Sequence, residues 1–172
     1  MQQTKIIAEY SAPIKAKPIA DQLHNLPPVS VKLISESDSE PLWDQLVRSY
    51  HYLGYQRLIG HRLKYTAFVE DQPVAALSWS APALKLAARD QFIGWSVTQR
   101  KRHLNQLASN SRFLIPPWVK IPNLASHVLS LNIAQLKKDW QQHFNKQLLV
   151  LETFVDSRYF KGTCNKFFIL RG

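Results

Sequence analysis

The sequence predicts an α/β (α+β) fold in which helices flank a mixed sheet within one domain. Segments typical of strands are interleaved along the chain with segments whose apolar residues recur at helical spacing. The 172 residues, 45% of them hydrophobic, are enough to bury one sizeable core. The chain shows neither an internal repeat nor a linker that would divide it into domains.

The first elements follow a proline-rich lead-in. Residues 1–28 contain four prolines and are expected to form an N-terminal arm. Residues 29–34 alternate between apolar and polar side chains and predict a strand. We expect Ser39 to cap a helix that has Pro41 in its first turn and that Gly54 ends.

The middle of the chain predicts a hairpin and two short helices. Residues 64–70 and 74–80 are rich in β-forming side chains, and residues 71–73 supply a turn. Residues 82–89 predict a short helix, and residues 92–97 predict a brief extended segment. Thr98 is expected to cap a basic helix that runs to about Ala108.

The second half predicts a strand, a long helix and a final strand. Residues 112–115 predict a strand, and Asn123 is expected to open the long helix. Residues 148–155 predict a nearly continuous apolar strand of the kind that a sheet buries on both faces. A hairpin followed by strand, long helix and strand is the order of elements in acetyltransferase-like (GNAT-like) domains. We therefore expect a GNAT-like mixed sheet, although a topology by itself confers no activity.

The positive charge of the chain is unevenly distributed. The net charge is +10, and residues 91–138 contain seven Lys or Arg residues but no Asp or Glu. Such a block favours a polyanionic partner, and its alternative is a solvated basic surface. The residues expected to contact nucleic-acid phosphates are Arg100, Lys101, Arg102 and Lys120.

Several classes of protein are excluded by what the sequence lacks. Its single cysteine cannot form an internal disulfide, and no apolar run has the length of a membrane span. The N-terminus lacks the apolar core of a signal peptide. We therefore expect a cytoplasmic protein with no membrane partner. The phosphate-loop, zinc-finger, HExxH, serine-elbow and dinucleotide-binding fingerprints are also absent.

Several short blocks, read together and in order, resemble a known family. They are YHYLGY (50–55), RD (89–90), IGW (93–95), NSRFLIP (110–116), NLAS (123–126), LETFVD (151–156) and FKGTC (160–164). In this order and spacing they are similar to the Druantia anti-phage protein DruA family over residues 29–164. The family also has a more distant similarity to the phage Mom DNA-modification proteins.

The resemblance implies a role in phage defence or in mobile-element biology, with defence or transposon proteins as partners. Relatives are expected to continue beyond Cys164 with a helix and a glycine-rich strand. Residues 165–172 are therefore interpreted as an aberrant C-terminal tail, and the chain as a form shortened there and at its N-terminus.

The first catalytic candidates are acidic. Glu152 and Asp156 share one face of a strand, and with Asp90 they could hold Mg²⁺ for phosphodiester chemistry. The alternative is that Asp90 pairs with Arg89 or a lysine and that Asp156 caps a turn. No metal site is assigned.

His51 and Arg112 are the other catalytic candidates. His51 precedes a glycine and could act as an acid or base, or simply pack at a helix end. Arg112 lies in an apolar strand and needs a partner, which is either a phosphate or Glu152.

The start of the long helix is a candidate donor site. Asn123 and Ser126 lie where acetyltransferase-like domains hold the coenzyme A pyrophosphate. The glycine-rich loop of that site is missing, because the chain has no glycine between Gly94 and Gly162. Asn123 would otherwise be an ordinary helix cap, and the cofactor stays unassigned.

Three functions remain open at this point. The chain is a GNAT-like enzyme acting on nucleic acid, a non-catalytic DNA-binding partner of a nuclease, helicase or transposase, or a metal-dependent nuclease.

Overall fold

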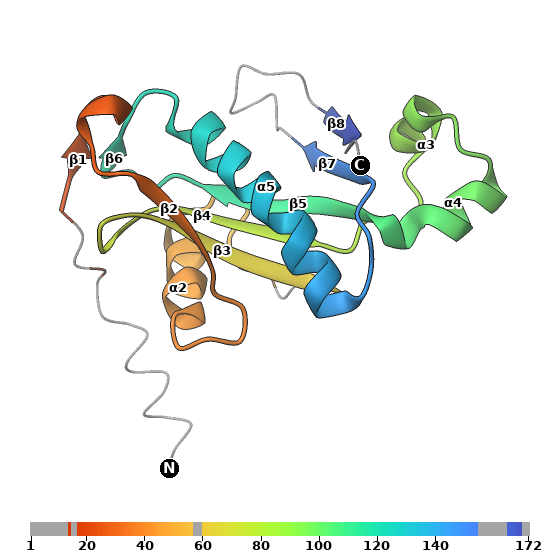
Figure 1. Ribbon diagram of the computed structural model, residues 1–172, viewed down its shortest axis with the longest axis horizontal. Helices are drawn as coiled ribbons and strands as arrows, with labels where there is room; N and C mark the ends of the chain where they lie inside the picture. The colour runs from red at the N-terminus through yellow and green to blue at the C-terminus, as the bar shows by residue number, and fades with distance from the viewer. Residues whose placement is uncertain (1–13, 15–16, 57–59, 155–164, 170–172) are drawn as a thin grey trace, which may run out of the picture. The chain divides into compact units, whose positions relative to one another are not determined.

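The computed structural model describes residues 14, 17–56, 60–154 and 165–169. Strands and helices are interleaved along this part of the chain, as Figure 1 shows. Their order is β1 (Ile19–Ala20), η1 (Leu23–Asn25), β2 (Val29–Leu33), α2 (Glu40–Tyr50), β3 (Arg62–Val69), β4 (Gln72–Ser80), α3 (Ala87–Ile93), α4 (Val97–His103), η2 (Leu104–Gln106), β5 (Leu107–Leu114), β6 (Val119–Lys120), α5 (Leu124–Phe144), β7 (Val150–Phe154) and β8 (Asn165–Ile169).

Six of the strands form one mixed sheet in the order β2-β3-β4-β5-β7-β8. β2 pairs antiparallel with β3, and β7 pairs antiparallel with β8. β5 and β7 are parallel, and their register runs from Leu107–Val150 to Asn110–Thr153. β1 and β6 form a separate parallel pair. This mixture of parallel and antiparallel pairs confirms the predicted α+β class.

The chain forms two compact units. Unit one contains β1, η1, β2, α2, most of β3 and β4, β6 and the first half of α5. Unit two contains α3, α4, η2, most of β5, the second half of α5, β7 and β8.

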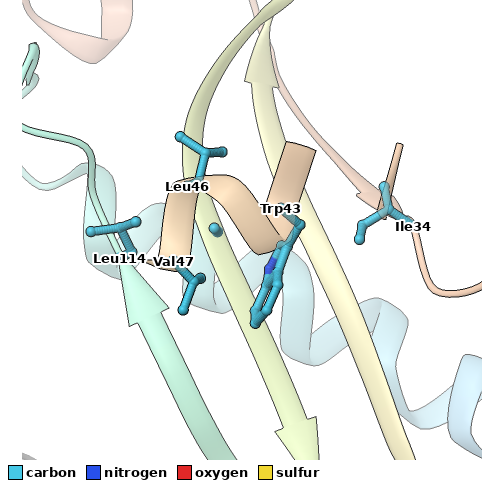
Figure 2. Close-up of a cluster of buried hydrophobic side chains, with 6 residues drawn as sticks. Ile34, Trp43, Leu46, Val47 and Leu114 are labelled. Atoms are coloured by element: carbon cyan, nitrogen blue, oxygen red, sulfur yellow. The ribbon is translucent and has the colours of Figure 1, made fainter. Parts of the chain in front are cut away.

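Helix α2 closes the core of unit one. Its buried residues Trp43, Leu46 and Val47 have the i, i+3, i+4 spacing of a helix face. They pack with Ile34, Ala76 and Leu114, as Figure 2 shows. The indole Nε1 of Trp43 also donates a buried 2.9 Å hydrogen bond to the Leu77 carbonyl, which satisfies the polar atom that this large side chain brings into the core.

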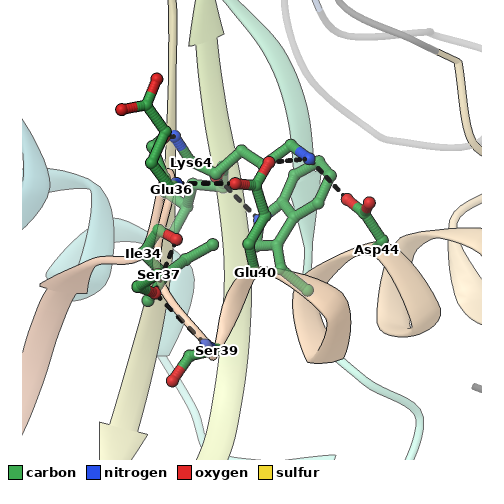
Figure 3. Close-up of polar contacts among 10 residues, drawn as sticks. Ile34, Glu36, Ser37, Ser39, Glu40, Asp44 and Lys64 are labelled. Carbon is green, nitrogen blue, oxygen red and sulfur yellow. Dashed lines mark hydrogen bonds and ion pairs between the residues drawn. The ribbon is translucent and has the colours of Figure 1, made fainter. Parts of the chain in front are cut away.

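A buried lysine fixes the same helix to β3. Lys64 Nζ lies 2.6 Å from Glu40 Oε1 and 2.5 Å from Asp44 Oδ1, as Figure 3 shows. The ammonium group also lies 4.8 Å from the Trp43 ring centroid. Burial lowers the pKa of Lys64, but the hydrogen bonds to Asp44 and Glu40 outweigh this and raise the pKa above its usual value. The lysine is therefore held in its charged form.

In unit two, one short helix has a clear start signal and another has a clear end signal. The Ser96 side chain accepts from Gln99 N–H, and the Gln99 side chain accepts from Ser96 N–H, which is a complete capping box for α4. Gly94 ends α3 with a φ of 77°, a conformation that glycine adopts without strain.

The predicted strands and long helices are present, but several boundaries were wrong. Ser39 makes no side-chain capping bond, and α2 ends at Tyr50 rather than at Gly54. The hairpin turn is at Glu70–Asp71, so Pro73 lies inside β4. Helix α3 covers residues 87–93 rather than 82–89, and the cap of α4 is Ser96 rather than Thr98. β5 begins at Leu107, where we expected the basic helix to continue.

Two segments outside the predicted domain are also structured. Within residues 1–28, Ile19 and Ala20 pair with Val119 and Lys120. Residues 165–169, which were interpreted as part of an aberrant tail, form β8 and pair with β7. In the described part of the chain, no helix is both long and apolar enough to cross a membrane.

Candidate functional site

The end of helix α2 builds the first candidate site, which we call the His51 cluster (His51, Tyr52, Gly54, Gln56 and Arg112). His51 is the C-cap residue of α2, and its Nδ1 accepts a 3.1 Å hydrogen bond from Leu53 N–H. The proton of the neutral ring is therefore on Nε2. The ring is buried and stacks on Tyr52, with 4.8 Å between their centroids.

Arg112 of β5 completes this cluster. Its Nε donates to the Gly54 carbonyl at 3.2 Å and its Nη2 to Gln56 Oε1 at 3.4 Å, so the guanidinium holds the turn that follows α2. Gly54 has a φ of 62°, which brings its carbonyl into this turn without the strain of a side chain.

The electrostatics of the His51 cluster hold its histidine neutral beside a cation. Burial and the nearby charge of Arg112 lower the pKa of His51 to about 4, so the ring is neutral at pH 7. Burial also lowers the pKa of Arg112, although Tyr52 opposes this effect. A neutral imidazole that donates from Nε2 beside a cation can bind or polarise an anionic oxygen, whereas it is a weak base.

A second group of charges lies inside unit two and forms the Arg89 network (Arg89, Asp90, Arg100 and Glu152). Arg89 is fully buried. Its Nε lies 3.3 Å from Asp90 Oδ1, and its Nη1 lies 3.6 Å from Glu152 Oε2. Arg89 Nη1 also donates to the Ala83 carbonyl at 2.9 Å. Arg100 of α4 donates to Asp90 Oδ2 at 2.7 Å. The network thus joins α3, α4 and β7.

The pKa shifts within this network have opposite signs. Burial raises the pKa of Asp90, but hydrogen bonds from Arg100 and Arg89 outweigh it and hold the pKa below its usual value. Burial raises the pKa of Glu152 above its usual value, against the opposing effects of Arg89 and the Ser109 side chain. Arg89 Nη2 is buried without a hydrogen-bond partner in the described structure. Arg89 is therefore buried with one of its donors unsatisfied, which is costly.

The third feature is a concave surface that we call the basic recess. It has a volume of about 390 Å³ and lies where η2 and the end of α5 meet. Three of its side chains are basic or imidazole: Arg102, His103 and Lys146. The other four carry carboxamides: Asn105, Gln106, Asn145 and Gln147. None of the described side chains that line it is acidic, so the recess suits a ligand with negative charge and hydrogen-bonding edges.

The His103 ring has a fixed position at this recess. Its Nδ1 lies 2.7 Å from Gln106 Oε1, and its ring stacks near Trp95 with 6.2 Å between centroids and 28° between planes. The recess therefore presents a flat ring that is held by two neighbours.

Comparison with known families decides where the chain belongs. The family model described as "Druantia protein DruA" matches residues 2–168. The chain belongs to the DruA family. Its match extends beyond the blocks of residues 29–164 on which the resemblance rested, and the family is that of an anti-phage system.

The fold of this DruA-family chain is GNAT-like. One solved structure similar to it is FeeM, an N-acyl amino acid synthase from uncultured soil microbes, with a TM-score of 0.50 and 12% sequence identity. The similarity covers 77% of this chain and 74% of FeeM. At this identity the similarity establishes the fold alone. No curated protein matches the chain.

The sequence blocks on which the resemblance rested supply most residues of the first two sites. His51 comes from YHYLGY and Arg112 from NSRFLIP, and the fold brings them together. Arg89, Asp90 and Glu152 come from RD and LETFVD, and Asp90 and Glu152 lie on two sides of Arg89. The Arg89–Asp90 pair was one of the two alternatives predicted for Asp90. Asp156 lies outside the described residues.

The other predicted residues are distributed over both units. Arg100 is engaged by Asp90, whereas Lys101 and Arg102 are exposed on α4. Lys120 is exposed on β6 of unit one. Asn123 has a φ of 61° and its carbonyl accepts the first hydrogen bond of α5 from His127 N–H, as a residue that opens a helix does. Asn123 and Ser126 are both exposed.

Sequence reasoning missed the amide side chains of the basic recess. Its lining comes from residues 102–106 and 145–147, which lie about forty residues apart in the sequence. The only local signal was the polar run Asn145-Lys146-Gln147 after an amphipathic helix, which reads as an ordinary helix end.

Proposed function

We propose that this DruA-family chain binds nucleic acid through the basic recess as part of anti-phage defence. The observation that carries the proposal is a concave surface that has Arg102, His103 and Lys146 in its lining and no acidic side chain among the described residues around it. One of its two segments, residues 102–106, belongs to the stretch of residues 91–138 that lacks Asp and Glu. Phosphate groups are the polyanion that such a surface favours.

DNA binding over a series of salt concentrations tests this proposal. The double variant Arg102→Ala/Lys146→Ala is compared with Lys85→Ala/Lys138→Ala, which removes the same charge from exposed residues of unit two outside the recess. We expect the recess variant to bind at least tenfold more weakly, and its log K against log [salt] slope to become shallower by roughly 1.5, because two phosphate contacts are lost. Fluorescence anisotropy with labelled DNA measures both quantities.

The control decides how the result is interpreted. Equal losses in the two variants would show that only net charge matters and would contradict a role for the recess. Absence of DNA binding by the folded wild-type chain at low salt would overturn the proposal as a whole.

A second candidate function is a transfer reaction on a base, as in the Mom proteins to which the family is distantly similar. The observation that favours it is the buried pair His51 and Arg112, since a hydrogen-bond donor beside a cation can stabilise a developing oxyanion. In this proposal Asn123 and Ser126, which belong to the same unit as His51 and Arg112, line the donor site.

Mass spectrometry of DNA nucleosides tests the second candidate. DNA is isolated from cells that express the wild-type chain or His51→Ala, so that the cell supplies the donor. A nucleoside of altered mass that needs His51 supports the transfer reaction. Identical nucleosides in the two cultures and in cells without the protein contradict it.

The geometry of the Arg89 network does not favour the metal-dependent nuclease. Asp90 and Glu152 both face the Arg89 guanidinium, which takes the place that a shared cation would need. Among the described side chains, no group of three His, Cys, Asp or Glu residues is arranged to hold a metal ion.

The proposed partners are nucleic acid and proteins of a defence system or transposable element, such as a nuclease, helicase or transposase.

A further inference from the structure

The carboxamide side chains of the basic recess can do more than hold phosphates. Phosphate oxygens only accept hydrogen bonds, and Arg102 and Lys146 already supply cations and N–H donors for them. Four carboxamides share the lining with them, and each carries both a donor and an acceptor. The oxygens of Gln106 and Asn145 already contact His103 and Gln141, so Asn105 and Gln147 are the two amides that we consider for a ligand. Asn and Gln with this pairing match the edges of nucleobases.

The state of the DNA restricts which base edges can reach these amides. The recess has a volume of about 390 Å³ and opens at the surface, and a base that remains in a duplex keeps its faces stacked and its Watson–Crick edge paired. An unpaired base can turn into such a hollow, as bases do in single-strand and base-flipping proteins.

His103 adds the stacking surface that unpaired bases prefer. Its ring lines the recess and is held by Gln106 and by stacking near Trp95. A ring that is already ordered loses little conformational entropy when a base stacks on it.

We infer that the basic recess binds an unpaired nucleotide of single-stranded DNA, with the base against His103 and the amides of Asn105 and Gln147, and the flanking phosphates at Arg102 and Lys146. This inference rests on the proposed function and specifies its substrate. It assigns to the amides the choice of single strand over duplex, whereas the cations attract DNA of either kind.

The test compares one DNA sequence as a single strand and as a blunt duplex, with the wild-type chain and two neutral double variants. Asn105→Ala/Gln147→Ala removes two exposed amides from the recess without changing the charge. Gln91→Ala/Gln142→Ala removes two exposed amides of unit two outside the recess and is the matched control. Circular dichroism and thermal unfolding confirm that each variant is folded.

We expect the wild-type chain to bind the single strand more tightly than the duplex. The recess variant should lose at least fivefold in affinity for the single strand, which corresponds to about 1 kcal/mol for an amide–base contact, and should bind the duplex unchanged. The control variant should match the wild type on both DNAs.

The opposite outcomes separate this inference from the proposed function. If both DNAs bind equally and the amide variant behaves as the wild type, the inference is overturned, while a salt-sensitive loss in Arg102→Ala/Lys146→Ala still supports nucleic-acid binding. If neither DNA binds, both proposals fail.

Discussion

His51 combines a structural and a chemical feature in one side chain. It ends helix α2, and its Nδ1 is occupied by the Leu53 N–H. Such a ring can donate from Nε2 but takes up a proton only at the expense of that hydrogen bond and beside the charge of Arg112. The pH dependence of stability is therefore a direct test of its environment.

The free energy of unfolding should fall as the pH is lowered from 6.5 towards 4. In the unfolded chain His51 has an ordinary pKa near 6.5, whereas in the folded chain the pKa is about 4. Between these values the unfolded state binds more protons, so the contribution is fully present above pH 6.5 and is lost as the pH falls, by up to about 3 kcal/mol. Urea unfolding between pH 4 and pH 8 measures it.

The variant His51→Asn should reduce this pH dependence, since its side-chain oxygen can still accept from Leu53 N–H but does not titrate. His24→Asn, at an exposed histidine of η1, is the control. A pH profile that is the same in the wild type and in His51→Asn would contradict the buried, neutral ring.

Arg89 is the residue of unit two whose removal should be most damaging. Arg89→Met leaves Glu152 buried without its cation, and we expect a loss of about 3–5 kcal/mol in the free energy of unfolding. In Arg89→Met/Glu152→Gln the buried carboxylate is also removed, and most of the loss should be recovered. Urea denaturation at pH 7 compares the variants, and a double variant as unstable as the single one would rule out this pairing.

Individual residues were predictable from sequence where their type was unusual for their place. Arg112 in an apolar strand was a candidate because a buried charge needs a partner. Asp90 and Glu152 were candidates because carboxylates can share a metal ion. Their partners were less predictable. Arg100 was expected to hold a phosphate but binds Asp90, because the loop between α3 and α4 folds the basic helix back onto α3. The spacing of residues along the sequence does not predict this change in chain direction.

At the scale of elements, helix α4 positions the basic recess. Its C-terminal residues Arg102 and His103 line that surface, and η2 follows directly. A helix of seven residues is too short to be stable alone, so it depends on its cap and on its contacts. The capping box at Ser96 is therefore a support for the recess.

Ser96→Ala should destabilise α4 by about 1 kcal/mol through loss of the cap. Hydrogen exchange should become faster at the amides of Val97–His103, with little change in α5. The exposed Thr98, which sequence reasoning had proposed as the cap, provides the control Thr98→Ala. Faster exchange in Thr98→Ala than in Ser96→Ala would contradict the capping box.

Elements with strong periodicity were predicted well, and short ones were not. Helix α5 and strands β2, β3, β4 and β7 lie within a few residues of their predicted bounds. Helices α3 and α4 were displaced because Ser96 and Thr98 are equally good caps in isolation, and Pro82 suggested a helix start that the structure does not use. The choice between such signals depends on tertiary contacts, here the packing of Arg89 and the ion pair between Arg100 and Asp90.

For the whole molecule, β8 bears on the stability of unit two. β8 is at the edge of the sheet and covers β7, the strand that carries Glu152. Without it, β7 would present unpaired N–H and C=O groups at an edge.

A chain that ends at Cys164 should therefore unfold at a lower temperature than the full chain and should self-associate. Thermal unfolding and size-exclusion chromatography test this. Removal of residues 170–172 alone, which follow β8, is the matched control and should have little effect. Equal stability of the two shortened chains would contradict a structural role for β8.

The pairing of β1 with β6 joins parts of the chain that are one hundred residues apart, since Ile19 pairs with Val119. Closing so long a loop for two residue pairs is entropically expensive, and the pair can form only when β6 is in place. During synthesis on the ribosome, the segment around Ile19 must therefore wait until most of the chain has been made. Under a pulling force applied at the N-terminus, the same pair should be the first pairing of strands to open in the described part of the chain.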